Sequence, residues 1–383
     1  MKPNEKIICI GTGIVSSHDK TIEDYRRDVL YKENRDIQRD SGMIENEYTC
    51  NAAMRYQDML ESAVSQAMKV TPKVNYTKQS RKLGMIVATS LGNLLDMEKL
   101  IYQDENEKLP LINGSVYKET RKIAEKFQVN GPCITVSNTC ASGINAISIA
   151  SLWLKNRKAD ICIVAGVDCI SRLIRSGLEA NGAITSRREC QVFQKDCDGL
   201  LLGEGAGALV LSRNEPEFQE YQLGVISGWA VFNDAKHIMS PDKQGEAMLE
   251  CVKASLEQAD VRANQIDCVC SSANGNYYND QMNAKVIREL YKWAGMKIPV
   301  TSLKHYTGHT LGASVIMEMV GILIMLDNDW ICPVSNQETI SDEYDDLLLE
   351  QKGKRNEMNR ILLFSNGFTG VNGVIVVEKQ EEC

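Results

Sequence analysis

Two segments of this chain share one design, and that repeat constrains the fold more than any other feature of the sequence. Residues 137–154 (SNTCASGINAISIASLWL) and 306–326 (YTGHTLGASVIMEMVGILIML) each begin with small polar residues around one reactive side chain. Each then continues as a long apolar stretch, and a strand-like segment follows. Stretches that are apolar on every face predict helices in the protein interior. We therefore expect two similar halves, each with a buried central helix, and Cys140 and His309 at matching helix starts.

The rest of the chain alternates strand-like and helix-like segments, which predicts an α/β layered fold. Strands are expected at 6–10, 83–88, 133–136 and 161–165, and helices at 20–30, 50–69 and 116–127. Residues 198–212 are rich in glycine and then strand-like. The most plausible join lies at 214–221, so we expect an N-terminal half at 1–213 and a C-terminal half at 220–383.

Composition excludes several classes of protein. The chain has 383 residues, a net charge of −8 and a pI of about 5.3, which disfavours a general nucleic-acid binder. Its longest apolar run, 315–326, is too short to span a membrane. The 13 cysteines are odd in number and scattered, with no CxxC pair, and there are four histidines. We expect a reducing compartment, hence the cytoplasm, without structural disulfides or a metal centre.

Cys140 is the candidate nucleophile. A cysteine at the start of a buried helix lies in the positive end of the helix dipole, which favours the thiolate. Small neighbours on both sides leave room for a substrate. The alternative is a buried core cysteine, which is the role expected for the other twelve.

His309 lies in Thr-Gly-His-Thr-Leu-Gly and is the second candidate. A histidine there can donate a hydrogen bond to a thioester oxygen, or orient and deprotonate a thiol. The alternative is a structural histidine. The glycine cluster 11–13 follows a strand, but Ser16 stands at the third glycine of a nucleotide-binding loop and no acidic partner follows, which disfavours such a loop. The cluster 203–207 leads into a strand, which predicts close backbone packing.

Several motifs together resemble the β-ketoacyl-ACP synthase family, in the family's order and over nearly the whole chain. These are IICIGTGIVSS, GPCITVSNTCASGINAI, FQKDCDGLLLGEGAGALVL, NDAKHIMSPDKQGEAM, VTSLKHYTGHTLGAS and SNGFTGVNG. The resemblance implies a thiolase-like, five-layered α-β-α-β-α fold of two similar halves. It implies no cofactor and no metal, because the substrates are carried on the phosphopantetheine of acyl carrier protein.

The resemblance also implies a role for each site residue. Cys140 would accept the acyl chain, and the backbone N–H groups of Cys140 and Phe368 would form the oxyanion hole. His309 would bind the thioester carbonyl of the extender unit. Lys304 and Glu318 would support His309. The remaining implied substrate-binding residues are Phe368, at the position of a gating phenylalanine, and Thr307.

One side of this site departs from the family pattern. Asn274 stands where the family has a second catalytic histidine, and Asn283 where it has an acidic residue. The family's closing Gly-Phe-Gly-Gly is Gly-Phe-Thr-Gly here, which introduces Thr369. Asparagine donates hydrogen bonds but does not titrate. We therefore expect acyl loading on Cys140 to survive better than decarboxylative condensation.

Three functions follow from this pattern. The first is a β-ketoacyl-ACP synthase of fatty-acid or polyketide biosynthesis that condenses with Cys140, Asn274 and His309. The second is a non-elongating transacylase, and the third is a partner of an active ketosynthase, like a chain-length factor. The missing histidine counts against the first, and the intact Cys140 counts against the third.

The resemblance implies two kinds of partner. The first is acyl carrier protein, and the second is another subunit, either a second copy or a different ketosynthase-like chain. Carrier proteins are acidic, so one basic cluster near the pocket is expected to steer them. The candidate clusters are Arg121, Lys122 and Lys126 on one side, and Lys155, Arg157 and Lys158 on the other.

Overall fold

One ten-stranded sheet runs through the molecule, and its two halves repeat the same strand order. The structure, a computed structural model, describes residues 6–16, 19–31, 52–69, 81–95, 98, 115–187, 189–237, 242–335 and 340–380. The N-terminal strands are β1 (Ile7–Ser16), β2 (Leu83–Ala88), β3 (Cys133–Val136), β4 (Ile161–Asp168) and β5 (Gly205–Arg213). The C-terminal strands are β6 (Gly224–Asn233), β7 (Cys268–Cys270), β8 (Val300–Thr301), β11 (Arg360–Asn366) and β12 (Val371–Glu378).

The sheet order is β3-β2-β4-β5-β1-β6-β12-β11-β7-β8. When the strands of each half are numbered in order of appearance, both halves read 3-2-4-5-1 from the outer edge to the centre. They meet where β1 and β6 pair antiparallel, with Ile7 opposite Ile226. The internal repeat seen in the sequence therefore corresponds to a repeat of topology.

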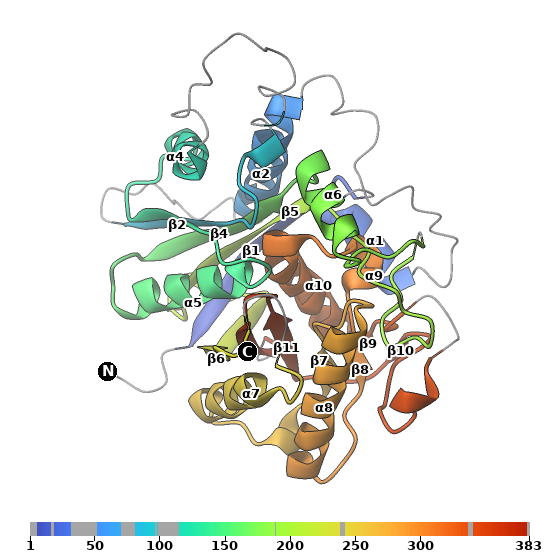
Figure 1. The fold of residues 1–383 in the computed structure, drawn as a ribbon. Helices are drawn as coiled ribbons and strands as arrows, with labels where there is room; N and C mark the ends of the chain where they lie inside the picture. Colours follow the sequence, from blue (N-terminus) through green and yellow to red (C-terminus); the bar gives the residue numbers. More distant parts are fainter. Residues whose placement is uncertain are drawn as a thin grey trace.

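The N-terminal and C-terminal halves of the sheet form two β layers. Together with the helices they make a five-layered α-β-α-β-α arrangement (Figure 1), as the family resemblance implies. Helices α2 (Ala52–Lys69) and α4 (Val116–Lys126) cover the N-terminal strands from outside, and α7 (Glu246–Ala259) and α8 (Tyr277–Ala294) cover the C-terminal strands. Helices α5 (Ser142–Lys155) and α10 (Ser314–Asn328) form the central layer between them.

The remaining elements are short or peripheral. They are α1 (Ile22–Tyr31), α6 (Arg172–Ala180), α9 (Lys304–Thr307), η2 (Pro216–Tyr221), η3 (Ala263–Gln265), η4 (Leu311–Ala313), η5 (Asp342–Tyr344), β9 (Trp330–Ile331) and β10 (Lys354–Arg355). The short helix η2 joins β5 to β6.

The central helices show why apolar sequence on every face places a helix in the interior. Every residue of α10 from Ser314 to Leu326 is buried. The segment Leu311–Asn328 is long and apolar enough to cross a membrane, yet 89% of it is buried inside this fold, so it is a core helix. Both central helices begin later than predicted, at Ser142 and Ser314. Cys140 and His309 thus lie in the loops that lead into the helices.

The glycines of β1 permit a close helix–sheet contact. A Cβ atom on Gly13 would lie 2.0 Å from the carbonyl oxygen of Ala63 on α2, and one on Gly11 would lie 2.2 Å from that of Ala67. These glycines therefore let α2 lie directly on the strand.

The two ends of the sheet differ. The outer edge of β8 is covered, because the Val300 N–H donates to the Leu348 carbonyl at 2.8 Å and the Glu350 N–H donates to the Val300 carbonyl at 3.0 Å. The other end is β3, whose four side chains are half-buried. Within the described ranges, no strand pairs with the outer edge of β3.

Candidate active site

A five-residue segment, Gly199–Gly203, brings the predicted site residues together. The Gly199 N–H donates to the Gly275 carbonyl at 3.2 Å, directly after Asn274. The His309 N–H donates to the Leu201 carbonyl at 2.7 Å, and the Gly203 N–H donates to the His309 carbonyl at 3.0 Å. Leu200 and Leu202 pack in one buried cluster with Cys140. One segment thus contacts the surroundings of all three residues.

Cys140 is 6% exposed and lies in an apolar cluster. Its buried neighbours there are Ile170, Leu200, Leu202 and Leu311, and its partly buried neighbours are Leu91, Ile174, Leu178, Ile184 and Phe368. Thr139, the residue before it, has a φ of 50°, which is uncommon for a β-branched residue. The Thr139 carbonyl accepts a hydrogen bond from the Ser142 hydroxyl at 2.6 Å, which helps to hold this turn.

Burial and the charge of Lys304 act on the pKa of the Cys140 thiol in opposite directions. Burial raises the pKa of its thiol to about 12, and the Asp168 carboxylate adds to this, whereas Lys304 acts in the opposite direction. Cys140 precedes the first residue of α5 by two positions, with Ala141 as the N-cap. Burial therefore opposes the thiolate that the position at a helix start was expected to favour.

His309 is buried and held in one orientation. Its Nδ1 lies 2.9 Å from the Ser314 hydroxyl, which leaves Nε2 for the pocket. Burial lowers the pKa of His309 to about 3, and the positive charge of Lys304 contributes. The ring is therefore neutral at physiological pH, so it can exchange a hydrogen bond without carrying charge.

Asn274 is 5% exposed, and its amide orientation is fixed. Its Oδ1 accepts a hydrogen bond from the Asn276 N–H at 3.1 Å, so its Nδ2 donors are the atoms left for a substrate oxygen. The Asn274 N–H donates to Asp280 at 2.9 Å.

Lys304 and Glu318 form a buried ion pair, with 3% and 2% of their surfaces exposed. The Glu318 carboxylate raises the pKa of Lys304 despite its burial. Lys304 acts electrostatically on Cys140, His309 and Asp280, which places its charge among the site residues. This arrangement is compatible with the supporting role that the resemblance implies.

The turn that carries Phe368 lies against the nucleophile loop. The Phe368 side chain packs on the cluster that contains Cys140. The Thr369 hydroxyl lies 3.3 Å from the Thr139 hydroxyl. The buried Thr307 side chain does not contact this turn in the same way, because its hydroxyl donates a hydrogen bond to the neighbouring Gly308 carbonyl at 2.9 Å.

Two buried carboxylates support the site and were not predicted as site residues. Asp168 accepts hydrogen bonds from the Thr89 hydroxyl and from the N–H groups of Ser90, Leu91 and Gly312. Asp280 accepts from the N–H groups of Phe193, Asn274 and Gly275. Burial raises the pKa of Asp168 to about 6 and that of Asp280 to about 7. An acid at the end of an apolar strand, as in VAGVD, is the signal that could have identified Asp168.

The predicted basic clusters do not lie as expected. On α4, Arg121 pairs with Glu125, Lys122 with Glu119, and Lys126 with Glu61. The second cluster begins at Lys155, the last residue of α5, about 20 Å along that helix from the end beside Cys140. Neither cluster is therefore an unpaired basic patch at the Cys140 end of the site.

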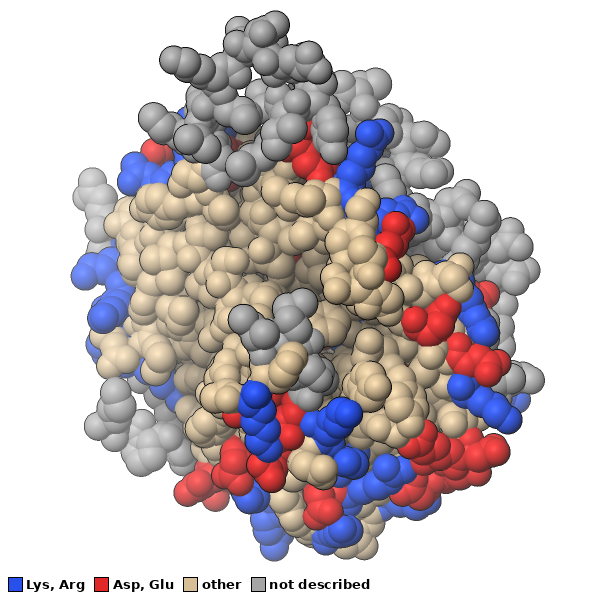
Figure 2. Space-filling model, viewed as in Figure 1, with Lys and Arg blue, Asp and Glu red and all other residues tan. Residues whose placement is uncertain are grey.

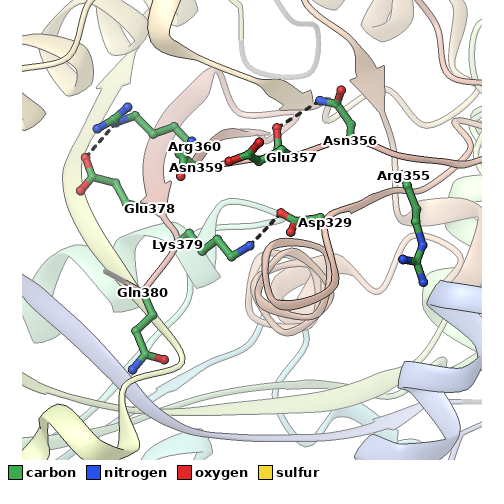
Figure 3. Close-up of a pocket in the computed structure, with 9 residues that line it drawn as sticks. All are labelled: Asp329, Arg355, Asn356, Glu357, Asn359, Arg360, Glu378, Lys379 and Gln380. Carbon is green, nitrogen blue, oxygen red and sulfur yellow. Dashed lines mark hydrogen bonds and ion pairs between the residues drawn. The ribbon is translucent and has the colours of Figure 1, made fainter. Parts of the chain in front are cut away.

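A cavity of about 660 Å³ lies beyond the other end of α10 (Figure 3). Four of its charged lining residues form ion pairs, because Lys379 contacts Asp329 at 2.8 Å and Arg360 contacts Glu378 at 3.3 Å. The 15 residues of α10 separate it from the His309 end by about 22 Å. Among the residues that the structure describes, no cluster of three or more His, Cys, Asp or Glu side chains is arranged to hold a metal.

Comparison with known proteins identifies the family. The model of the β-ketoacyl synthase N-terminal domain matches residues 16–217, and that of the C-terminal domain matches residues 223–338. The 3-oxoacyl-[acyl-carrier-protein] synthase 2 of Coxiella burnetii is 24% identical over 326 residues, which are 80% of this chain and 77% of that protein. The chloroplastic synthase I of Hordeum vulgare is 28% identical over 64% of this chain and 55% of its own length.

Polyketide proteins are similar as well. The ketosynthase alpha subunit of the tetracenomycin polyketide synthase from Streptomyces glaucescens is 23% identical over 68% of this chain and 63% of its own length. The matches to this protein and to the barley enzyme thus span less than two thirds of those proteins.

Solved structures share the fold. The structure of AntDE:AntF, a type II acyl carrier protein in complex with its ketosynthase, superposes with a TM-score of 0.87 at 22% identity, over 99% of this chain and 100% of that chain. The ishigamide ketosynthase/chain length factor gives 0.84 at 20% identity, over 99% and 100%. The two family models together cover most of the sequence, and the chain is therefore a member of the β-ketoacyl synthase family.

Proposed function

We propose that this chain is an acyltransferase that takes an acyl group from acyl carrier protein onto Cys140 as a thioester. The observation that carries the proposal is the segment Gly199–Gly203, which holds the nucleophile cluster, the His309 loop and the Asn274 loop together. The cluster around Cys140 supplies an apolar lining suited to an acyl chain.

The transfer exchanges the thioester on pantetheine for a thioester on Cys140. The Cys140 sulfur attacks the thioester carbonyl carbon, and the new carbon–sulfur bond forms as the bond to the pantetheine sulfur breaks. The proton of the Cys140 thiol passes to the departing pantetheine thiolate. The backbone N–H groups of Cys140 and Phe368 would stabilise the oxyanion, as the family resemblance implies.

His309 and Asn274 would act on the incoming carbonyl. With Nδ1 engaged by Ser314, a neutral His309 can present Nε2–H to a thioester oxygen. Asn274 can present Nδ2 in the same way, because its oxygen is engaged by Asn276. Two neutral donors can stabilise an enolate, but Asn274 cannot exchange a proton near neutral pH.

The lack of a titrating group at 274 favours a second candidate, a transacylase that loads and releases acyl groups without condensation. Mass spectrometry with peptide mapping distinguishes the candidates after incubation with acyl and malonyl carrier protein. A thioester on Cys140 with release of carbon dioxide and a lengthened product supports condensation. A thioester without carbon dioxide supports transacylation. No thioester at any chain length contradicts both and favours a partner role like that of a chain-length factor.

The surface is compatible with a second ketosynthase-like subunit, either identical or different. Figure 2 shows a wide surface over α5 and the strands beside it that carries charged side chains only at its left edge, whereas charges gather over α7 and α8. Leu152 of α5 and Tyr117 of α4 are 48% and 45% exposed. The edge strand β3 belongs to the same half.

We place the protein in the cytoplasm, because the eleven cysteines that the structure describes are all free thiols.

A further inference from the structure

A network of neutral side chains lies beside Asn274, and the proposed reaction assigns it no role. Its members are Ser271, Ser272, Asn279, Asn283 and Asn366. The serines precede Asn274 by two and three residues, and Asn279 and Asn283 lie on α8. Asn366 is the last residue of β11, two positions before Phe368. The network therefore lies between two segments of the site.

Asn283 is fully buried, and its amide is oriented by its partners. Its Oδ1 accepts hydrogen bonds from the hydroxyls of Ser271 at 3.1 Å and Ser272 at 3.0 Å. Its Nδ2 donates to the main-chain carbonyl of Asn279 at 2.9 Å. The oxygen faces donors and the nitrogen faces an acceptor, so both ends of the amide are matched.

Asn366 enters the network from the other side. Its Nδ2 donates to Oδ1 of Asn279 at 2.7 Å, and its Oδ1 accepts from the Ser272 hydroxyl. The Nδ2 of Asn279 in turn donates to the Ser272 carbonyl at 3.0 Å. The segment before Asn274 is thus hydrogen-bonded both to α8 and to the residue that leads into the Phe368 turn.

Ser272 couples the two ends of the network. Its hydroxyl has one proton, but the amide oxygens of Asn283 and Asn366 both lie within hydrogen-bond distance. A change at either asparagine alters where that proton is donated. Side-chain networks of this kind respond as a unit, not as separate bonds.

We propose that Asn283 and Asn366 are positioning residues, which hold the Asn274 segment and the Phe368 turn at a fixed separation through Ser272 and Asn279. The proposal rests on the proposed function, because its purpose is to present Asn274 and the Phe368 backbone together to a thioester on Cys140. The network must be neutral to work. An ionised carboxylate at 283 would face the Asn279 carbonyl with no proton between them. It would also stand near Asp280 on the same helix, on which the charge of Lys304 acts from the neighbouring segment.

The test uses Asn283→Asp, Asn366→Asp and the double variant of the full chain. Two rates are measured, acylation of Cys140 by a short acyl thioester and alkylation of Cys140 by iodoacetamide, which needs no oxyanion hole. At pH 8 we expect each single variant to acylate about tenfold more slowly, because a buried donor is replaced by a charge. Alkylation should stay within about twofold of wild type.

The double variant should be no worse than the slower single variant, because coupled residues are not additive. Lowering the pH should restore acylation. Burial raises the pKa of the new carboxyl, and its protonated form can donate where Nδ2 did. The control is Asn181→Asp, the same chemical change at the exposed end of α6, which should alter neither rate.

Each remaining outcome overturns one claim. If the fold-losses in acylation rate of the two single variants multiply in the double variant, the two residues act independently. A parallel loss of acylation and alkylation would show a merely structural role. Should Asn283→Asp fail to fold, the half-buried Asn366→Asp must show the separation of the two rates by itself. Wild-type protein that takes no acyl group contradicts the proposed function, whereas normal loading by every variant contradicts the network alone.

Discussion

The hydroxyls of Thr139 and Thr369 lie 3.3 Å apart, although the two residues are separated by 230 positions in the chain. Thr139 immediately precedes the nucleophile, and Thr369 follows Phe368 where the family motif has glycine. A hydrogen bond between these side chains therefore ties the turn that carries Phe368 to the loop that carries Cys140. Loss of this bond should loosen the cover over the nucleophile.

We predict that Thr369→Val alkylates faster with iodoacetamide at Cys140, by about fivefold, because one hydrogen bond contributes about 1 kcal/mol. The rate is followed by mass spectrometry. Thr369→Ser keeps the hydroxyl and should behave as wild type. Equal rates for the valine and serine variants would show that the contact does not hold the turn closed.

The Lys304–Glu318 pair should be strongly coupled. Lys304→Met leaves a buried carboxylate without its cation, which should lower the free energy of unfolding by about 3–5 kcal/mol. Adding Glu318→Leu removes the orphaned charge and should recover most of that loss. Guanidinium unfolding of the two single variants and the double variant measures the coupling. Additive losses would show that the two charges do not depend on each other.

His309 should make stability depend on pH. Its folded pKa of about 3 lies below the unfolded value of about 6.5, so below pH 6.5 the unfolded chain binds a proton that the folded chain does not. The stability contribution is complete above pH 6.5 and is lost as the pH falls toward 3, by about 1.4 kcal/mol per unit. His309→Gln cannot titrate and should lack this loss. Urea unfolding at pH 7.5, 6.5 and 5.5 gives the free energy of unfolding of wild type and of His309→Gln. If this free energy falls equally with pH in both proteins, the prediction is wrong.

Asn274→His should restore proton chemistry. A histidine there can accept the Asn276 N–H through Nδ1 and present Nε2 to the pocket, as the amide does now. The ring must find its space on the pocket side, because Gly275 packs against Gly199 and Gln191. We expect malonyl decarboxylation to rise about tenfold or more, relative to acyl loading.

The measured quantity is the ratio of carbon dioxide released to thioester formed. Asn274→Ala controls for simple enlargement of the pocket and should lower both carbon dioxide release and thioester formation. If wild-type protein already condenses as fast as it loads, asparagine is sufficient and the transacylase candidate is wrong.

Alternating strands and helices predicted an α/β layered fold with buried central helices, and the family resemblance implied its five layers. The segments 140–154 and 315–326 appear as α5 and α10, and the similarity between their surroundings corresponds to the shared strand order. Helix starts were less predictable. Cys140 and His309 lie in loops before the helices, because a turn and a short 3-10 helix intervene.

The supporting parts of the site left little signal in the sequence. Asp168 and Asp280 bind mostly backbone N–H groups, which every residue type provides, so their partners are hard to recognise in the sequence. Asn366 meets Asn279 from 87 positions away, and such pairs become visible only when the topology is known.

The difference between the two ends of the sheet limits how copies of this chain can assemble. The β8 end is sealed by residues 348–350, whereas the β3 end presents an edge to which the described chain adds no strand. A molecule with two open ends could join neighbours into an unlimited filament. If β3 is open as the described residues indicate, two subunits that meet edge to edge there consume each other's free hydrogen-bonding groups, and growth through sheet edges stops at a pair.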